Sequence, residues 1–451
     1  MNRRLAVKSS RQLRLDGVRI WMAALDAVNP EVAVRKYVKR RGNELRVGHR
    51  VYDLGKFKRI WVLGSGKAAA PMGRALEKIL GHHLTGGILV TKYGHGLPLK
   101  ITELLEAGHP LPDANGVAAG VRIRNLAKQV GRGDLVFCLF SGGGSALLVA
   151  PAAGITLEDK LACTRSLMNA GANIHELNAV RKHLSDLKGG GLARSLGGVP
   201  IISLILSDVV GNDLHTIASG PLVPDPTTFR DCQAIVQRLR VTGQIPPSIR
   251  RRIEAGVAGK IPETPKPGDP IFRTTHNVVV GSNAQACASA VRQARRLGYK
   301  SMVLTSRLEG DTGEAARLHM SIAQEIVFEG RPLRRPACLV SGGETTVEVT
   351  GGGKGGRNQE FVLHCARPLG SLPSPCLVAS LGTDGTDGPT EAAGAVADNS
   401  TLSRSLKFGA YFLAESLDNN DSYHFFKRLN DLIHTGPTRT NVMDLHIVLL
   451  G

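Results

Sequence analysis

The sequence predicts an α/β protein with two parallel-sheet lobes and an active-site cleft between them, and three observations support this. The chain has 451 residues, which is enough for two or three domains of ~150 residues. Short apolar or β-branched runs bounded by glycine alternate with helix-like segments, which is typical of parallel sheets covered by helices. A proline-rich stretch separates two such alternating series, so a second lobe is expected after it.

The first series begins after an amphipathic N-terminal segment. Apolar residues between Val18 and Val38 recur at helical spacing and predict one or two helices. Strands are then expected over 60–63, 87–90, 135–140 and 201–206, each followed by a helix-like segment. The second series predicts strands over 277–280, 301–304, 338–340, 345–349, 377–380 and 447–450.

These elements define the expected domains. They are a basic extension over 1–15, an N-terminal α/β domain over 16–245, a proline-rich linker over 246–270 and a C-terminal α/β domain over 271–451. Both domains are expected to be Rossmann-like. In open parallel sheets ligands bind beyond the carboxyl ends of the strands, so the loops after the strands are the first places to seek an active site.

Composition narrows the class of protein. Hydrophobic residues make up 42% of the chain and charged residues 21%, which excludes wholesale disorder. No apolar run reaches the ~18 residues of a membrane-spanning helix, so no membrane partner is expected. The seven cysteines are widely spaced and contain no C-x-x-C pair, which predicts reduced, mostly buried thiols.

The formal net charge of +19 raises the question of an anionic partner. More than half of the excess lies in residues 1–59, and the glycine-rich patches are not unusually basic. This favours a basic solvated surface over a nucleic-acid footprint, and the 4% aromatic content counts against base stacking. A basic nucleic-acid-binding protein stays as the non-enzyme alternative. The first fifteen residues loosely resemble a mitochondrial transit peptide, but a short extension on a cytoplasmic protein is the simpler interpretation.

The loop after the first strand reads Gly64-Ser65-Gly66-Lys67-Ala68-Ala69. A glycine turn, a helix start and a lysine together can hold a phosphate. The Walker A pattern fails because Ala68 follows the lysine. The dinucleotide pattern G-x-G-x-x-A is satisfied, which makes a nicotinamide-dependent dehydrogenase the rival. The second strand, however, ends in Thr91 and Lys92 where that fold needs an acid for the ribose.

Two further loops follow buried strands of the N-terminal half. Ser141-Gly142-Gly143-Gly144-Ser145 comes after 135–140, and successive glycines can form a nest of amides for an anion. Asp208 comes directly after 201–206, where its carboxylate can hold Mg²⁺ or a substrate hydroxyl, or can cap the next helix. The G-x-S-x-G nucleophile elbow is absent from these loops, so an esterase would lack its key residue.

Glycine-rich loops also follow strands of the C-terminal half. Segment 351–356 contains five glycines and Lys354, which suits close approach to a triphosphate, and the planar guanidinium of Arg357 follows it. The Asp-Gly repeats at Asp384 and Asp387 are either plain turns or metal ligands. Glycine loops, cations and strand-end aspartates are the components of a phosphoryl-transfer site. The helical stretch Asn178, Arg181, Lys182, His183 and Lys188 offers cations for the carboxylate of an acceptor.

Eleven motifs in one order resemble the type II glycerate kinases, also called the MOFRL family and once widely labelled hydroxypyruvate reductases. The resemblance runs from about Val18 to the C-terminus. The motifs are GSGKAA (64–69), EAGHPLPD (106–113), SGGGSAL (141–147), LNAVRKHLS (177–185), KGGGLA (188–193), LSDV (206–209), IASGP (217–221), SGGETTV (341–347), GGRNQE (355–360), TDGTDGPT (383–390) and TGPTRTNV (435–442).

The resemblance implies a two-lobed enzyme that transfers the γ-phosphoryl group of ATP, with Mg²⁺, to the 2-hydroxyl of D-glycerate, giving 2-phospho-D-glycerate and ADP. It implies that Lys67 stabilises the transferring group, that Asp208 acts near the metal or the acceptor hydroxyl, and that Arg357 closes over phosphates. We expect a monomer or homodimer. An NAD(P)-dependent hydroxypyruvate reductase is the alternative. The expected nucleotide-binding residues are Gly64, Ser65, Gly66, Ser141, Gly142, Gly143, Gly144, Ser145, Gly343, Glu344, Lys354 and Asp384, and the expected metal ligands are Asp208 and Asp384.

Three positions depart from the family pattern. Asn212 stands in place of an aspartate, and an amide is a poorer partner for Mg²⁺. Leu222 replaces the threonine that usually follows G-P, and Arg439 replaces a glycine, where it would narrow a nucleotide pocket or add a phosphate contact. The candidates for a general base are Asp208 and His183.

Overall fold

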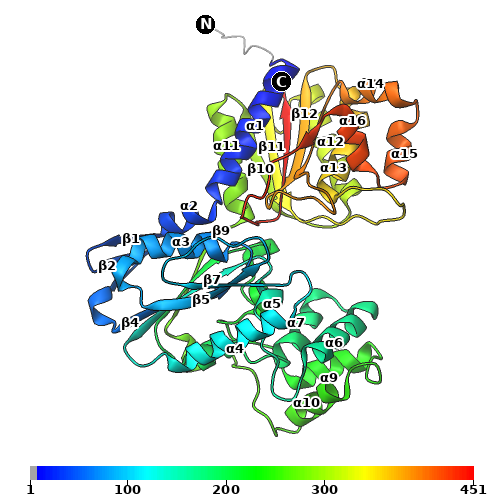
Figure 1. Ribbon diagram of the computed structural model, residues 1–451. Coiled ribbons are helices and arrows are strands. Elements are labelled where there is room, and N and C mark those ends of the chain that lie inside the picture. The colour runs from blue at the N-terminus through cyan, green and yellow to red at the C-terminus, as the bar shows by residue number, and fades with distance from the viewer. Residues whose placement is uncertain (1–7) are drawn as a thin grey trace. The chain divides into compact units, whose positions relative to one another are not determined.

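The computed structural model describes residues 8–451, which divide into two compact units (Figure 1). Unit 1 combines the chain up to Asn29 with Gly281–Gly451, and unit 2 is Pro30–Val280. The predicted linker over 246–270 lies inside unit 2 and contains helix α10 (Pro247–Val257), which buries Ile249 and Ile253. The prolines predicted a linker, but Pro247 stands at the first position of α10, where proline favours the start of a helix. Residues 1–7 of the predicted basic extension lie outside the described residues.

Unit 2 is built on a six-stranded sheet in the order β6-β5-β4-β7-β8-β9. The pairs from β6 to β8 are all parallel, as predicted. Every residue of β7 and β8 is buried, which explains their unbroken apolar sequence. The strands are β4 (Arg59–Ser65), β5 (Gly86–Lys92), β6 (Glu103–Ala107), β7 (Asp134–Ser141), β8 (Ile201–Leu206) and β9 (Thr275–Gly281). Strand β9, predicted to open the second series, is instead the edge of this first sheet.

Helices and a small antiparallel sheet complete unit 2. The sheet has the order β1-β2-β3, with β1 (Val38–Arg41), β2 (Glu44–Val47) and β3 (Arg50–Asp53). A separate apolar cluster lies among α6, α7, α9 and α10 and includes Leu177, Val180 and Ile249. The remaining helices are α2 (Pro30–Tyr37), α3 (Ala69–Leu80), α4 (Ala114–Gln129), α5 (Gly144–Leu147), α6 (Leu157–Asn169), α7 (Ile174–His183), α8 (Gly191–Ser195) and α9 (Phe229–Arg238).

Unit 1 has a mixed sheet, in the order β10-β11-β15-β12-β13-β14, where a parallel sheet was predicted. Only β10 and β11 pair in parallel, because the last strand, β15, inserts antiparallel between β11 and β12. Strands β11, β12 and β15 are buried throughout, so their apolar runs look the same in either direction. The strands are β10 (Lys300–Leu308), β11 (Ala337–Gly343), β12 (Cys376–Gly382), β13 (Gly394–Asp398), β14 (Leu432–Ile433) and β15 (Asp444–Leu450). The strand predicted over 345–349 is wrong, since only Thr346 forms an isolated bridge there.

The N-terminal helix α1 (Ser10–Ala27) belongs to unit 1, where it packs on α11. Buried Asp16 accepts hydrogen bonds from Lys8 at 2.7 Å and from Tyr299 at 2.8 Å. Arg14 forms ion pairs with Asp398 and Asp431. Some of the basic residues of the N-terminal segment therefore form ion pairs that hold this helix on unit 1. The other helices are α11 (Asn283–Arg296), α12 (Thr312–Glu329), α13 (Arg357–Gly370), α14 (Thr401–Ser405), α15 (Phe412–Asp418) and α16 (Ser422–Leu429).

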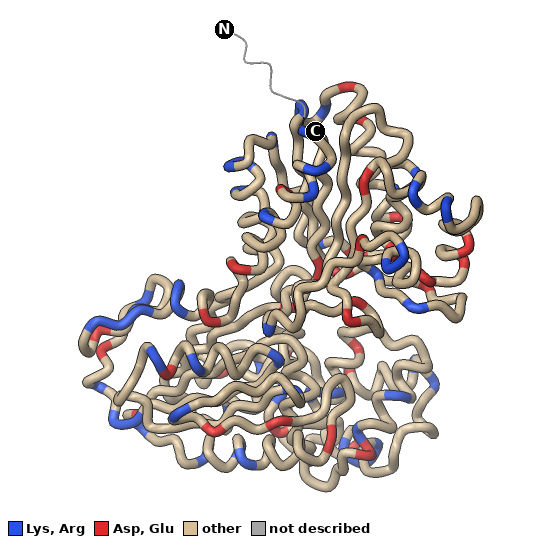
Figure 2. The backbone as a smooth tube through the Cα atoms, turned by 45° about the horizontal axis from the view of Figure 1, so that its top comes forward, with Lys and Arg blue, Asp and Glu red and all other residues tan. Residues whose placement is uncertain are grey.

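The predictions on cysteine and charge can be compared with this fold. All seven cysteines are free and buried, as expected. Lys and Arg are scattered over both units (Figure 2). Over residues 8–451, no helix is long and apolar enough to cross a membrane.

Candidate active site

The loop between β4 and α3 in unit 2 presents Lys67 on a backbone that is already fully bonded. The amide of Lys67 donates to the carbonyl of Gly142 at 2.8 Å, and that of Ala68 donates to Ser141 Oγ at 2.9 Å. The amides of Gly66 and Ala69 also have carbonyl acceptors. A Cβ at Gly66 would lie 2.1 Å from Ser141 Oγ, so glycine permits this contact between the two loops. The loop therefore contributes the Lys67 side chain. Its amides were predicted to hold a phosphate, but they are already bonded within the protein.

The glycine loop after β7 has the open amides that the first loop lacks. Gly143 has φ +82° and begins the short helix α5. In the described part of the chain, no acceptor is recorded for the amides of Gly143, Gly144 and Ser145. A Cβ at Gly143 would lie 2.8 Å from His109 and 3.5 Å from the Lys67 side chain. The structure thus brings three unused amides beside Lys67, as an anion nest requires.

The third loop places Asp208 directly after buried β8. The 3₁₀ turn that follows it has Val209 at its N-cap position, without a side-chain cap. Asp213 accepts hydrogen bonds from the His215 amide and the Thr216 hydroxyl. Burial acts to raise the pKa of Asp213, but these hydrogen bonds outweigh it and lower that pKa. Asp213 therefore stabilises the loop, which leaves Asp208 as its catalytic candidate.

A chain of polar contacts connects the α5 loop to the segment after α7. Ser145 Oγ lies 2.7 Å from Ser219 Oγ, which donates to Asn178 Oδ1 at 3.2 Å. Buried Lys188 donates to the Ser145 carbonyl at 2.7 Å and to its hydroxyl at 3.2 Å. Sequence reasoning missed Ser219, which is 0% exposed and has φ +60°. Ser145 is thereby fixed between the nest and a buried ammonium.

His183 and Lys182 have structural roles in this unit. Buried His183 bonds through Nδ1 to the carbonyl of Ala179 at 2.8 Å and through Nε2 to Glu263 at 3.1 Å. Lys182 is paired with buried Asp225 at 3.4 Å. Because both ring nitrogens of His183 are occupied, it does not fit the predicted role of a general base.

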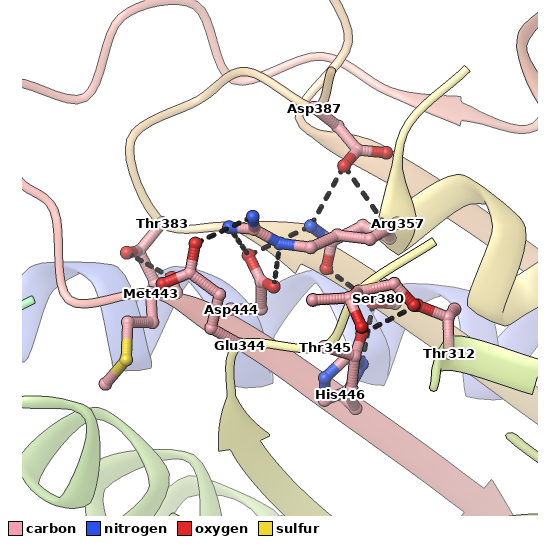
Figure 3. Close-up of polar contacts among 12 residues, drawn as sticks. Thr312, Glu344, Thr345, Arg357, Ser380, Thr383, Asp387, Met443, Asp444 and His446 are labelled. Carbon is pink, nitrogen blue, oxygen red and sulfur yellow. Dashed lines mark hydrogen bonds and ion pairs between the residues drawn. The ribbon is translucent and has the colours of Figure 1, made fainter. Parts of the chain in front are cut away.

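In unit 1, Arg357 lies between two carboxylates (Figure 3). Its Nε and Nη2 donate to Asp444 at 2.5 Å and 3.2 Å, and Nη1 lies 2.8 Å from Glu344. Burial raises the pKa of Asp444 to about 6, although Arg357 opposes the shift. The nearby carboxylates raise the pKa of Arg357 against the effect of its own burial. Sequence reasoning missed Asp444, whose one signal is a carboxylate at the head of a mostly apolar strand.

A buried network orients this ion pair (Figure 3). Asn358 Nδ2 donates to Asp444 at 3.0 Å and to Asp387 at 3.1 Å. Ser380 donates to Asn358 Oδ1 at 2.6 Å and lies 2.7 Å from His446 Nδ1. Asp387 also accepts the amides of Asn358 and Gln359 at the start of α13. Asp387 is therefore a helix-capping residue, and the metal-ligand interpretation of it does not fit.

The glycine segment 351–356 is bound by the protein itself. Asn420 Oδ1 accepts the amides of Thr350 and Gly351, and Asn419 accepts those of Gly352 and Gly353. Asp421 accepts the amide of Lys354 at 2.9 Å. The Lys354 ammonium lies 4.3 Å from the Tyr423 ring centre and 3.7 Å from Glu391. The glycines here permit contact with the α15–α16 turn, which occupies the amides of residues 351–354 that were predicted to meet a triphosphate.

The predicted metal ligands lie in different units, Asp208 in unit 2 and Asp384 in unit 1. Asp384 Oδ1 accepts the amide and hydroxyl of Thr386, which is the geometry of a turn. Within residues 8–451, no group of three or more His, Cys, Asp or Glu side chains could hold a metal ion. Arg439 has φ +60°, a conformation that favours glycine. Arg439 therefore lies on a strained backbone.

Comparisons with known proteins identify the family of this chain. Residues 16–254 match the family described as a domain of unknown function, DUF4147, and residues 337–444 match the MOFRL family. The chain is 41% identical to a protein named glycerate 2-kinase from Pyrococcus horikoshii, over 97% of each chain. It is 37% identical to a D-glycerate 2-kinase from Thermotoga maritima, covering 96% of this chain and 97% of that protein.

A solved structure extends the similarity to the fold. The crystal structure of a glycerate kinase from Thermotoga maritima superposes with a TM-score of 0.87 at 37% identity, covering 98% of this chain and 100% of that one. With near full-length similarity in both sequence and fold, this chain belongs to the glycerate kinase family that carries the DUF4147 and MOFRL domains.

Proposed function

We propose that this protein is a kinase that transfers the γ-phosphoryl group of ATP to the 2-hydroxyl of D-glycerate, giving 2-phospho-D-glycerate and ADP. The observation that carries the proposal is the 41% identity to a glycerate 2-kinase over 97% of both chains. A bond forms between the 2-hydroxyl oxygen and the γ-phosphorus, and the bond from that phosphorus to the β–γ bridging oxygen breaks. The hydroxyl proton passes to water, because a loose transition state requires little deprotonation of the acceptor before attack.

Three groups in the described structure suit the chemistry of this transfer. Catalysis of phosphoryl transfer rests on positioning and on neutralising charge at the transferring group. The open amides of 143–145 and the ammonium of Lys67 supply donors for phosphate oxygens in unit 2. Arg357 supplies a guanidinium in unit 1, held rigid by Asp444. We therefore assign Lys67 and Arg357 to catalysis, together with Asp208 from the loop after β8.

Mg²⁺ fits this donor set when nucleotide phosphates supply most of its ligands. Mg²⁺ is commonly bound through one or two carboxylates plus phosphate oxygens and water. Asp208 provides a carboxylate at the end of β8, and the described residues contain no larger cluster of metal-ligating side chains. When bound, the ion would neutralise phosphate charge, and the role of Asp208 would be to hold it on the nucleotide.

Hydroxypyruvate reduction with NAD(P)H is less compatible with the same loops. A dinucleotide site uses free amides at the first glycine turn and an acid at the end of the second strand. The amides of residues 66–69 are all bonded within the protein, and β5 ends at Lys92. The free amides and the acid that a dinucleotide site requires are therefore both missing from the β4–α3–β5 segment that suggested the reductase.

The test is ³¹P NMR of the purified protein with ATP, Mg²⁺ and D-glycerate, beside a parallel assay of NADH oxidation with hydroxypyruvate. A 2-phosphoglycerate signal is expected and NADH oxidation is not. A 3-phosphoglycerate signal would refute the assigned position of transfer, and intact ATP with NADH turnover would refute the kinase. Lys67→Met should lower kcat by about 100-fold or more. The matched control is Lys78→Met, on the exposed surface of helix α3, which follows the Lys67 loop, and it should retain activity.

A further inference from the structure

Unit 2 contains three neighbouring cations that the proposed function has not used. Lys160 lies on α6, Arg181 on α7 and Lys188 in the loop after α7. The two helices pack against each other (Figure 1). Lys188 is 4% exposed, and Lys160 and Arg181 are partly buried. The ammonium of Lys160 donates to the carbonyl of Leu184, which lies between Arg181 and Lys188 in the chain. Burial, followed by repulsion from Lys160 and Arg181, lowers the pKa of Lys188 well below its ordinary value.

These cations are not neutralised by the residues around them. In the described structure, Arg181 has no hydrogen bond or ion pair to any acceptor. The Lys160 ammonium donates to the carbonyl of Leu184 at 3.1 Å, and within the described residues the Lys188 ammonium donates only to Ser145. Asp186 is the carboxylate that acts on Lys160, but it is already paired with Arg124 at 2.6 Å. Partly buried charges without a partner are costly, so this cluster is complete only when an anion joins it.

The cluster also adjoins the loop that holds the open amides. Lys188 contacts both the carbonyl and the hydroxyl of Ser145, and the amide of Ser145 is one of the three in the nest. One N–H of the Lys188 ammonium remains beyond these two bonds. An acidic group bound here would therefore lie next to the phosphate-binding loop, while Arg181 offers a planar fork that matches a carboxylate.

We propose that Lys160, Arg181 and Lys188 form the binding site for the carboxylate of the acceptor hydroxy acid. The proposal rests on the proposed function for the identity of that acceptor. A carboxylate and a nucleotide phosphate share the chemistry that the cluster recognises, and the carboxylate is favoured because the nest and Lys67 already serve the phosphates. The cluster would then select acidic acceptors over neutral polyols, since only an acid neutralises the three charges.

The experiment compares Arg181→Gln with Arg165→Gln. Arg165 is an exposed arginine on α6 and serves as the matched control. Binding of D-glycerate is measured by titration calorimetry without nucleotide, and KM is measured separately for D-glycerate and for ATP. We expect Arg181→Gln to weaken D-glycerate binding and raise its KM by about 10- to 100-fold, because a charge-assisted hydrogen bond is lost. The KM for ATP should stay within twofold, and Arg165→Gln should match the wild type. Arg181→Lys should restore part of the affinity.

Each other outcome overturns the proposal. A rise in the KM for ATP with unchanged D-glycerate binding would assign the cluster to nucleotide phosphates. Unchanged binding of both ligands would show that the cluster binds neither. Glycerol, which lacks the carboxylate, should bind no more weakly to Arg181→Gln than to the wild type, and an equal loss for glycerol would indicate damage to the fold. Failure of the proposed function would appear differently, as wild-type protein that binds D-glycerate but does not phosphorylate it.

Discussion

The ion pairs of Arg357 allow a quantitative test of how burial decides the strength of a salt bridge. Two carboxylates contact the same guanidinium, Asp444 at 2.5 Å and Glu344 at 2.8 Å. The Asp444 side chain is 1% exposed and that of Glu344 is 47% exposed. Removing one partner of a buried pair leaves an uncompensated charge and costs about 3–5 kcal/mol, whereas an exposed pair contributes about 0–1 kcal/mol.

The variants are Asp444→Asn and Glu344→Gln, which keep the size of each side chain. The chain's two tryptophans lie one in each unit, Trp21 in unit 1 and Trp61 in unit 2. In a Trp61→Phe background, the fluorescence of buried Trp21 therefore reports urea unfolding of unit 1 alone. We expect the free energy of unfolding to fall by about 3–5 kcal/mol in Asp444→Asn and by less than about 1 kcal/mol in Glu344→Gln. Equal losses, or a larger loss at Glu344, would refute the assignment of Asp444 as the residue that holds Arg357.

Further predictions concern unit 2, followed through Trp61 in a Trp21→Phe background. Gly66→Ala places a Cβ 2.1 Å from Ser141 Oγ and should lower unfolding free energy by about 2–4 kcal/mol. A Cβ at Gly42 has no atom within 4 Å, so Gly42→Ala should lower the free energy of unfolding by about 1–2 kcal/mol. Equal losses in the two variants would contradict the predicted clash at Gly66. Burial, with Arg181, lowers the pKa of Lys160 to about 8. Unfolding raises that pKa, so between pH 8 and 10.5 the unfolded chain binds more protons than the folded chain. The free energy of unfolding of the wild type should therefore rise with pH in this range relative to that of Lys160→Met. A pH-independent difference in urea midpoints would exclude this.

The parallel sheet of unit 2 could be predicted from sequence because each of its central strands is a short apolar run ended by glycine or serine. The sheet of unit 1 could not, since β15 is buried on both faces and its sequence carries no mark of direction. Periodicity also could not show that α1 packs against α11, more than 250 residues later in the chain. That docking depends on long-range pairs such as Arg14 with Asp398, which local sequence does not encode.

The candidate site was predicted best where strand ends fix the position of a residue. Lys67, Ser145 and Asp208 follow strands β4, β7 and β8, and the parallel pairing of these strands places all three at one edge of the sheet. Asp444, Asn358 and Lys160 could not be found in this way. Asp444 is the first residue of its strand and does not follow one, and the other two lie on helices, so their roles depend on packing.

The glycine-rich loops show why composition alone does not identify an anion site. All three of the loops at 64–66, 142–144 and 351–356 are rich in glycine, and the sequence predicted phosphate contacts for each. In the first, neighbouring loop atoms accept the amides, and in the third Asn419, Asn420 and Asp421 accept them. In the second loop, the consecutive amides of residues 143–145 have no acceptor among the described residues. Glycine allows close approach of any group, and whether that group is a ligand or the protein's own side chain depends on which acceptors the fold brings there. When an aspartate or asparagine from a distant turn accepts the amides of a glycine-rich loop, those amides hold the fold together and no longer bind phosphate.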